Sequence, residues 1–369
     1  MLAAEELSKM YDDVINMNYG NPDLITDDII ISEALKDARE GHTKYTESRG
    51  DPALREEISK FYKEEHDINV ADGEIIVTTG GNVAMFMALE AITDEGDEVI
   101  VHTPSYTTYI QQIELARGVP VMLPTYEEKN FEVDPEALVG LITPRTKSII
   151  INTPTNPTGA CFSKETLMGI AKAAIEHDLI VIADDIYSLY SFEQPFFPIA
   201  ALPGMKDRTI IINSFSKDYV MAGWRVGSII APENIVTTLR LINENLVAIA
   251  PSVSQRAAIH ALQSRGRIQA KYREEYKNRV LYAAERVNNM KNISAMPPKG
   301  TFYLFANIKK TGLTSEQAAS LILKEAHVCV LPGNAFGDGG EGYVRFSCVH
   351  EMKKLKEAFD RIAAMAIFQ

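Results

Sequence analysis

The sequence predicts an α/β protein in which a large, mostly parallel seven-stranded sheet is followed by a smaller α+β part. Short runs rich in Ile and Val recur through the middle of the chain, and most are continuous rather than alternating with polar residues. Continuous apolar runs are typical of strands buried on both faces of a parallel sheet. Helical patterns separate several of these runs, and strands that alternate with helices indicate an α/β fold. After about residue 255 the pattern changes to long charged helices with a few strands.

Each run is assigned to an element. We expect the strands of the large sheet at 74–80, 98–104, 120–124, 148–154, 179–185, 209–215 and 226–232. Helices are expected at 83–92 and 164–177. Asp51 and Pro52 open another helix, because an aspartate cap with proline in the first turn marks a helix start. That helix carries a core stripe at helical spacing, formed by Leu54, Ile58, Phe61 and Tyr62. Three further strands are expected at 301–308, 327–333 and 343–349.

The composition is that of an ordinary globular protein of one large or two smaller domains, with 369 residues, 46% apolar and 24% charged. A net charge of −13 argues against nucleic acid or an anionic membrane as the main partner. No apolar stretch approaches the roughly 18 residues that span a bilayer, and the acidic N-terminus is unlike a signal peptide. The three cysteines and seven histidines lack metal-ligand spacing. We therefore expect a cytoplasmic protein without a metal.

Five polar clusters follow the expected strands, at the edge where open α/β sheets bind their ligands. They are Thr79–Asn82, Pro104–Tyr106, the turn 152–159 that holds Asn156, Asp184–Tyr187, and the stretch from 213 to 225 with Ser214, Lys217 and Arg225. Gly80 and Gly81 before a helix allow backbone N–H groups to approach a phosphate. Taken singly, a Gly-Gly turn or a polar loop after a strand is more often structural.

Together, the five clusters match the needs of a phosphorylated nitrogen heterocycle. A lysine provides a covalent anchor, an aromatic side chain a stacking surface and the Gly-Gly helix start a phosphate site. A carboxylate that ends a fully apolar strand costs several kcal/mol unless a cation meets it, and a ring N–H⁺ is such a cation. Pyridoxal 5′-phosphate requires this set of groups.

The chain resembles a fold-type I, class I/II aminotransferase of the aspartate aminotransferase superfamily. The resemblance runs from about Asn18 to the C-terminus through NYGNPD, KYTESRGDPALR, VTTGGN, PSY, NTPTNPTG, ADDIY, SFSK…GWRVG and YVRFS, in the family's order. Only the N-terminal arm is shorter than usual. The resemblance implies a large cofactor-binding domain at 29–255, and a small domain made of the N-terminal segment 1–28 and the C-terminal part 256–369.

The resemblance also implies roles for the residues around the cofactor ring. Lys217 would hold the cofactor as an internal aldimine and then move the proton between the substrate Cα and C4′. Asp184 would pair with the pyridinium nitrogen; Asp185 is the competing candidate, but Asp184 has the family's spacing to Tyr187. Tyr187 and Asn156 would hydrogen-bond the phenolic oxygen. Tyr106 would stack on the ring.

The phosphate and the substrate are assigned by the same resemblance. Gly80, Gly81, Asn82, Ser214 and Arg225 would hold the phosphate. Arg345 would bind the substrate α-carboxylate as a fork, with Asn156 and the Gly20 backbone nearby. Tyr45 would cross to the phosphate in the partner subunit, which implies a homodimer.

The implied reaction is transfer of an amino group from an L-amino acid to a 2-oxo acid, with 2-oxoglutarate the expected acceptor. β-Elimination by a pyridoxal-phosphate C–S lyase remains open, because the cofactor residues are shared. A non-catalytic sensor is disfavoured, since such regulators usually carry a DNA-binding module. A nicotinamide-binding protein is disfavoured because no strand leads into GxGxxG. Relatives that act on aspartate often have lysine directly after the Gly-Gly; Asn82 at that position favours a hydrophobic or aromatic donor.

Overall fold

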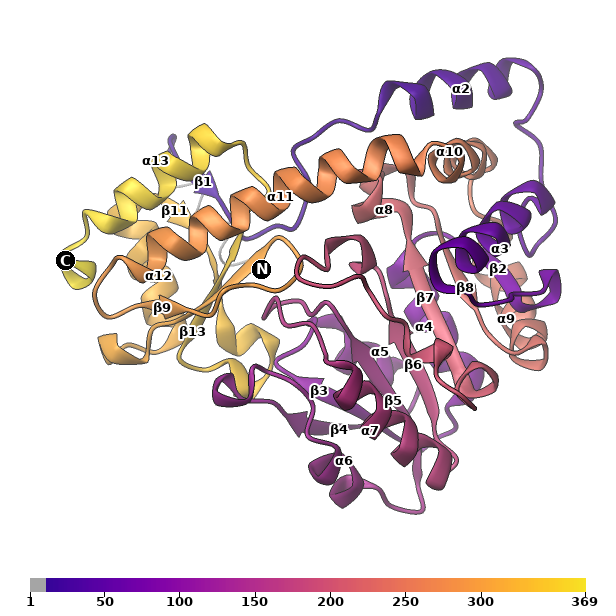
Figure 1. Ribbon diagram of the computed structural model, residues 1–369, viewed down its shortest axis with the longest axis horizontal. Coiled ribbons are helices and arrows are strands. Elements are labelled where there is room, and N and C mark those ends of the chain that lie inside the picture. Colours follow the sequence, from indigo (N-terminus) through magenta and orange to yellow (C-terminus); the bar gives the residue numbers. More distant parts are fainter. Residues whose placement is uncertain (1–10) are drawn as a thin grey trace.

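The computed structural model describes residues 11–369, and its centre is a seven-stranded sheet (Figure 1). The strand order is β2-β8-β7-β6-β5-β3-β4. Only β8 runs antiparallel to its neighbours. The strands are β2 (Ile75–Thr78), β3 (Glu98–Thr103), β4 (Val119–Pro124), β5 (Thr146–Asn152), β6 (Ile180–Asp184), β7 (Thr209–Ser214) and β8 (Gly227–Ile230). All seven expected strands are thus confirmed to within a few residues, as is the mostly parallel sheet.

Burial explains why these strands read as continuous apolar runs. Every residue of β2, β3 and β8 is buried. Within β3, Val99 and Val101 belong to one apolar cluster and Ile100 to another, so successive side chains enter cores on opposite faces of the sheet. The edge strand β4 is instead largely accessible. It contains Pro120 and Pro124, residues that are confined to edge positions because they donate no ladder hydrogen bond.

Helices cover both faces of the sheet. One face carries α4 (Gly81–Ile92), α5 (Thr108–Leu115) and α9 (Glu233–Leu246), and α4 contacts both of the others. The other face packs against α6 (Pro135–Leu141) and α7 (Lys164–Glu176). A third group is formed by α2 (Asp28–Arg39), α3 (Pro52–His66) and α10 (Ser252–Gln263). The side chain of Asp51 accepts from Ala53 N–H at the start of α3, and the predicted stripe of that helix is buried.

The C-terminal part contains a second, antiparallel sheet of four strands, in the order β12-β13-β10-β9. These are β9 (Ser294–Ala295), β10 (Tyr303–Asn307), β12 (Leu331–Pro332) and β13 (Tyr343–Ser347), covered by α11 (Arg265–Asn288), α12 (Ser315–Ala326) and α13 (Met352–Ala363). One strand was expected at 327–333. The chain instead forms β11 (Val328–Cys329) and then β12, because the first pairs with the N-terminal strand β1 (Ile15–Asn16) and the second with β13.

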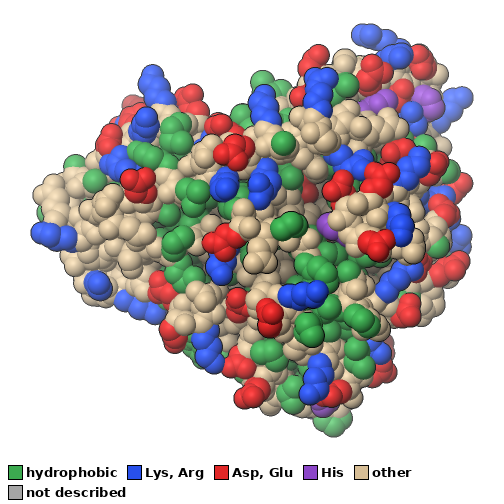
Figure 2. Space-filling model, in the orientation of Figure 1, with side chains coloured by type: hydrophobic (Ala, Val, Ile, Leu, Met, Phe, Trp, Pro, Cys, Tyr) green, Lys and Arg blue, Asp and Glu red, His purple; other side chains and the backbone are tan. Residues whose placement is uncertain are grey.

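Figure 2 shows Lys and Arg side chains interspersed with Asp and Glu over one face of the molecule. Within residues 11–369, no helix has the length and apolar character needed to cross a bilayer. The same residues contain no group of three or more His, Cys, Asp or Glu side chains arranged to hold a metal ion. No disulfide joins any two of the described cysteines Cys161, Cys329 and Cys348. The first ten residues of the expected N-terminal segment lie outside the described part of the chain.

Candidate active site

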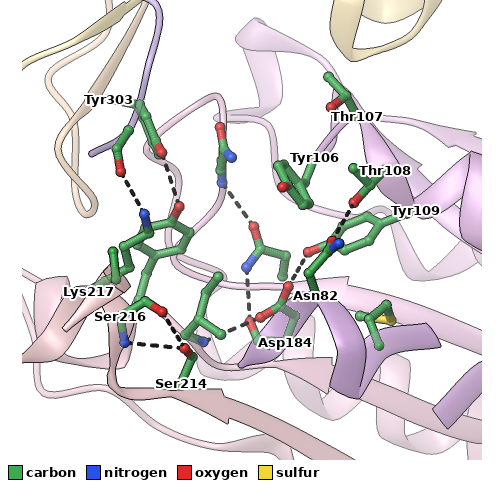
Figure 3. A pocket seen from close by; sticks show the side chains of 18 of the residues that line it. Asn82, Tyr106, Thr107, Thr108, Tyr109, Asp184, Ser214, Ser216, Lys217 and Tyr303 are labelled. Atoms are coloured by element: carbon green, nitrogen blue, oxygen red, sulfur yellow. Dashed lines mark hydrogen bonds between the residues drawn. The ribbon is translucent and has the colours of Figure 1, made fainter. Parts of the chain in front are cut away.

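A cavity of about 320 Å³ lies where the carboxyl ends of β5, β6 and β7 meet the C-terminal sheet (Figure 3). Its wall brings together most of the residues singled out from the sequence. These are Gly20, Gly81, Asn82, Tyr106, Asn156, Asp184, Tyr187, Ser214, Lys217, Arg225 and Arg345. They come from segments up to 325 residues apart in the chain, since the wall joins Gly20 to Arg345.

Lys217 lies in the short helix α8 (Phe215–Asp218), which begins directly after β7. Ser214 caps this helix by accepting a hydrogen bond from Ser216 N–H, at 3.2 Å. The Lys217 amine donates to the Gly20 carbonyl at 2.6 Å. Burial lowers the pKa of Lys217 to about 8, helped by the positive charges of Arg345 and Arg225. About a tenth of this lysine is therefore an uncharged, nucleophilic amine at pH 7, far more than for a lysine with the ordinary pKa.

Asp184 ends β6 and has almost no solvent contact. Tyr109 donates its hydroxyl proton to one carboxylate oxygen, and Ile186 N–H reaches the other at 3.4 Å. Burial raises the pKa of Asp184 to about 6. Among the described residues, neither of these donors carries a positive charge, so the carboxylate still lacks the cation that its burial calls for. Asp185 does not line the cavity, and of the two acids only Asp184 faces it.

The start of α4 brings together groups that are able to bind an anion. Gly80 caps this helix with a φ of +85°, and a Cβ at that position would lie 2.5 Å from an Arg225 guanidinium nitrogen. Gly80 itself does not line the cavity; it leaves room for Arg225, which donates to the Ala222 carbonyl at 2.9 Å. The hydroxyls of Ser214 and Ser216 lie 2.9 Å apart nearby. A helix N-terminus, a guanidinium and hydroxyl donors are the groups that bind a phosphate.

The opposite wall carries Arg345, which is buried on β13. Its guanidinium donates to the Asn156 side-chain oxygen at 2.9 Å and to the Asn18 carbonyl. Its Nε has no hydrogen-bond partner among the described residues. The guanidinium lies between two aromatic rings, with its carbon 4.3 Å from the centroid of Tyr303 and 4.9 Å from that of Phe336. A buried, planar cation with a free donor fits a carboxylate.

Several residues of the cavity were not identified from the sequence. Tyr109 follows Tyr106 by three residues, and that spacing near the start of a helix was the available signal. Asn152 donates to the Asp184 carbonyl at 2.9 Å and accepts from Asn156 N–H at 2.9 Å. It opens the NTPTNPTG turn and could have been found from that motif. Tyr19, Ser216, Tyr303 and Phe336 also line the cavity, without a comparable signal.

Tyr45 does not line this cavity. It lies in the loop between α2 and α3, and its side chain is 87% exposed. The role expected for it concerns a second copy of the chain, so it stays a prediction.

Comparisons with known proteins agree with this geometry. The family model for aminotransferase class I and II matches residues 12–362. An aspartate aminotransferase from Pyrococcus abyssi is 40% identical over 97% of this chain and 94% of its own length. Aromatic-amino-acid aminotransferase 2 from Thermococcus litoralis is 37% identical over 98% and 95%. The crystal structure of the aromatic aminotransferase from Pyrococcus horikoshii superposes with a TM-score of 0.93 and 38% identity, covering 97% of each chain.

Enzymes of this family depend on pyridoxal phosphate, and the cavity suits that cofactor. It offers a buried amine at Lys217, a buried acid at Asp184 and, at the start of α4, a helix N-terminus beside the Arg225 guanidinium. With the buried guanidinium of Arg345 on the facing wall, and with a family match that covers nearly the whole sequence, the chain belongs to the class I and II aminotransferases and is a pyridoxal-phosphate-dependent enzyme.

Proposed function

We propose that this aminotransferase moves the amino group of an L-amino acid to 2-oxoglutarate, with Lys217 as the covalent attachment point of the cofactor. The observation that carries the proposal is the buried Lys217 amine, whose pKa is lowered to about 8. Such an amine can attach to a carbonyl group and can also accept and return a proton. The bound cofactor supplies an electron sink for the substrate Cα.

The other residues of the cavity then have distinct tasks. Asp184 would hold the cofactor's ring nitrogen, and Tyr106 would offer an aromatic surface to the ring. Tyr187 and Asn156 donate to the phenolic oxygen. Gly81 and Asn82 at the start of α4, together with Ser214 and Arg225, would hold the phosphate, and Arg225 would supply a charge-assisted hydrogen bond. The role expected for Gly80 becomes an indirect one, since it leaves room for Arg225.

The substrate is held on the opposite wall. Arg345 binds the α-carboxylate with Asn156, and the Gly20 backbone lies beside it. The residue after the Gly-Gly is Asn82, not lysine, so that position offers no charge to a distal carboxylate. We therefore propose a hydrophobic or aromatic donor. The names of the relatives include both aspartate and aromatic-amino-acid aminotransferases, so the donor has to be measured.

We further propose a cytoplasmic homodimer in which Tyr45 reaches the phosphate site of the partner subunit. The exposure of this tyrosine supports the proposal, since 87% of a large side chain is left in solvent in the single chain. We keep the division into a large domain at 29–255 and a small domain formed by 1–28 and 256–369.

The test combines activity with chemical labelling. Purified protein is mixed with single amino acids and 2-oxoglutarate, and glutamate is measured; formation of pyruvate and ammonia without an acceptor would support the C–S lyase instead. Borohydride reduction followed by peptide mapping should place a phosphopyridoxyl group on Lys217. Lys206, which pairs with Glu74 away from the cavity, provides the control: Lys206→Ala should keep the label and Lys217→Ala should lose it. A label on another lysine contradicts the assignment.

A further inference from the structure

Tyr303 lies on β10 and contacts two groups that serve different parts of the proposed reaction. Its side chain is 3% exposed. Its hydroxyl oxygen lies 3.1 Å from the hydroxyl oxygen of Tyr187, and its ring lies against the Arg345 guanidinium. One side chain thus joins the residue proposed for the cofactor's phenolic oxygen to the residue proposed for the substrate α-carboxylate.

The hydroxyl of Tyr303 is held at a defined place. A Cβ added at Gly20 would lie 1.7 Å from this oxygen, so position 20 must be glycine for the tyrosine to fit. The carbonyl of the same Gly20 accepts the hydrogen bond of Lys217 at 2.6 Å. The Tyr303 hydroxyl is therefore packed against the backbone unit that holds the lysine, next to Tyr187.

The ring of Tyr303 forms one side of an aromatic clamp around Arg345, and Phe336 forms the other. A guanidinium between two aromatic faces is attracted to both and is restrained in its plane. Its in-plane edge remains available, because its Nε has no partner among the described residues. The two rings therefore orient the guanidinium but leave its Nε–H available to donate to a ligand.

The backbone before Tyr303 is strained. Thr301 has a φ of +60°, which is unfavourable for a β-branched residue. Its N–H donates to the Tyr190 carbonyl at 3.0 Å, and its hydroxyl accepts from Tyr303 N–H at 3.1 Å. A Cβ at Gly300 would lie 2.6 Å from the Cβ of Pro154, so the chain is also fixed one residue earlier. Strain of this kind persists where surrounding contacts over-determine the conformation, and it gathers at functional sites.

We propose that Tyr303 is a positioning residue with two separable actions, an inference that rests on the proposed function. The ring holds the Arg345 fork in the plane that receives the α-carboxylate. The hydroxyl donates to the Tyr187 oxygen, which directs the single proton of Tyr187 towards the cofactor's phenolic oxygen. A hydroxyl has one proton to donate, and a donor whose own oxygen accepts a hydrogen bond becomes a stronger donor.

Two variants separate the actions in the cofactor-loaded enzyme. Tyr303→Phe keeps the ring and removes the hydroxyl, whereas Tyr303→Leu removes both. The matched control is Tyr276→Phe, because Tyr276 is buried in the same apolar cluster but lies outside the cavity. For each protein we would measure the pH midpoint of the cofactor's visible absorbance change. We would also measure the inhibition constant of the deaminated analogue of the preferred donor, 3-phenylpropionate for phenylalanine or succinate for aspartate.

Tyr303→Phe should raise the pH midpoint by a few tenths of a pH unit. The shift is small because losing one hydrogen bond of a chain weakens the next bond in that chain by only a fraction of its strength. The midpoint rises because a weaker Tyr187 donor stabilises the more negative form of the cofactor less. The inhibition constant should stay within about twofold, since the clamp is intact. Tyr303→Leu should show the same rise in midpoint and a further increase in the inhibition constant of about 3- to 30-fold, the range of a lost cation–π contact. Tyr276→Phe should change neither.

An unchanged pH midpoint in Tyr303→Phe would overturn the hydroxyl role, and an unchanged inhibition constant in Tyr303→Leu would overturn the clamp. If circular dichroism shows that Tyr303→Leu is unfolded, Tyr303→Met, which fills the space with an unbranched side chain, replaces it in the same comparison. Failure of the proposed function looks different, because the wild-type protein would then carry no label on Lys217 and form no glutamate.

Discussion

Replacing Asp184 with asparagine should stabilise the cofactor-free protein. The carboxylate is buried against Tyr109 and the Ile186 backbone, and burial raises its pKa from the usual 3.8 to about 6. A carboxyl group with a higher pKa in the folded state than in the unfolded state resists ionisation on folding. Its favourable contribution is therefore complete below about pH 4 and is lost as the pH rises through about 6. At pH 8 the cofactor-free protein contains an ionised Asp184 carboxylate that burial destabilises.

The size of the effect follows from the two pKa values. The difference between 3.8 and about 6 corresponds to about 3 kcal/mol of folding free energy at pH 8. Asparagine removes that cost but leaves its amide N–H₂ group without an obvious acceptor, and an unsatisfied buried donor lowers the folding stability by about 1 kcal/mol. We expect Asp184→Asn to be about 2 kcal/mol more stable than wild type at pH 8, and to lose this advantage by pH 4. The nearby Asp185, whose pKa is also raised by burial and by the Asp184 charge, shifts the result in the same direction.

Urea unfolding of both cofactor-free proteins at pH 4, 5, 6 and 8 measures this difference. The pKa of Lys217 is about 8, so that lysine stays mostly charged between pH 4 and 6. Its partial titration at pH 8 occurs in both proteins and therefore largely cancels in the difference between them. Asp178→Asn is the control, because Asp178 is exposed and pairs only with Arg208 at 3.1 Å among the described residues; it should show no pH-dependent gain. The reasoning fails if Asp184→Asn is no more stable than wild type at pH 8, or if its advantage persists at pH 4. With cofactor bound the order should reverse, since losing one partner of a buried charged pair costs about 2–5 kcal/mol of affinity.

Two further predictions test the facing wall and the assembly. Arg345→Lys should keep the yellow colour but lower kcat/KM for every donor by about 30-fold or more, because a point charge replaces the fork. The control Arg279→Lys, a change at a buried arginine outside the cavity, should leave kcat/KM within about twofold. The opposite ranking would place the carboxylate site elsewhere. Mixed under subunit exchange, inactive Tyr45→Ala and Lys217→Ala chains should recover activity, since one site of the heterodimer then has an intact lysine and the neighbour's tyrosine. No recovery despite exchange confirmed by mass, with each variant inactive alone, would mean that Tyr45 serves its own subunit, and a light-scattering mass of one chain would exclude the dimer.

The sequence predicted the large sheet and much of the cavity wall for the same reason. Parallel strands buried on both faces are recognisable as apolar runs, and their carboxyl ends meet at one edge. Asp184 and Lys217 could therefore be placed beside each other although 33 residues separate them, since they follow the neighbouring strands β6 and β7. The antiparallel direction of β8 could not be predicted, because the run 226–232 looks the same in either direction.

Contacts that depend on side-chain conformation across distant segments were not predictable in the same way. The hydrogen bond from Tyr109 to Asp184 joins residues 75 positions apart, and nothing in helix α5 or strand β6 alone specifies it. The clamp around Arg345 depends on Tyr303 from β10 and on Phe336 from the 3-10 helix Gly333–Phe336, so it appears only when the antiparallel register of β10 and β13 is known. The break between β11 and β12 depends on pairing with β1, which no local pattern records.

The segment from β1 to Gly20 contacts the cavity residues through its backbone. The Asn18 carbonyl accepts from Arg345 and the Gly20 carbonyl accepts from Lys217, while the Met17 carbonyl accepts from Ser347 N–H at 2.8 Å. Carbonyl contacts are nearly indifferent to side-chain identity but depend strictly on the count of residues. Removing one residue between Met17 and Gly20 would shift the chain on one side of the deletion by about 3.3 Å, the rise of one extended residue. The carbonyls that contact Arg345, Lys217 and Ser347 could then not all keep their positions. In a mutational scan every single-codon deletion or insertion in this stretch should therefore abolish activity, and substitutions should be tolerated best at the partly exposed Tyr19, since Met17 and Asn18 are buried.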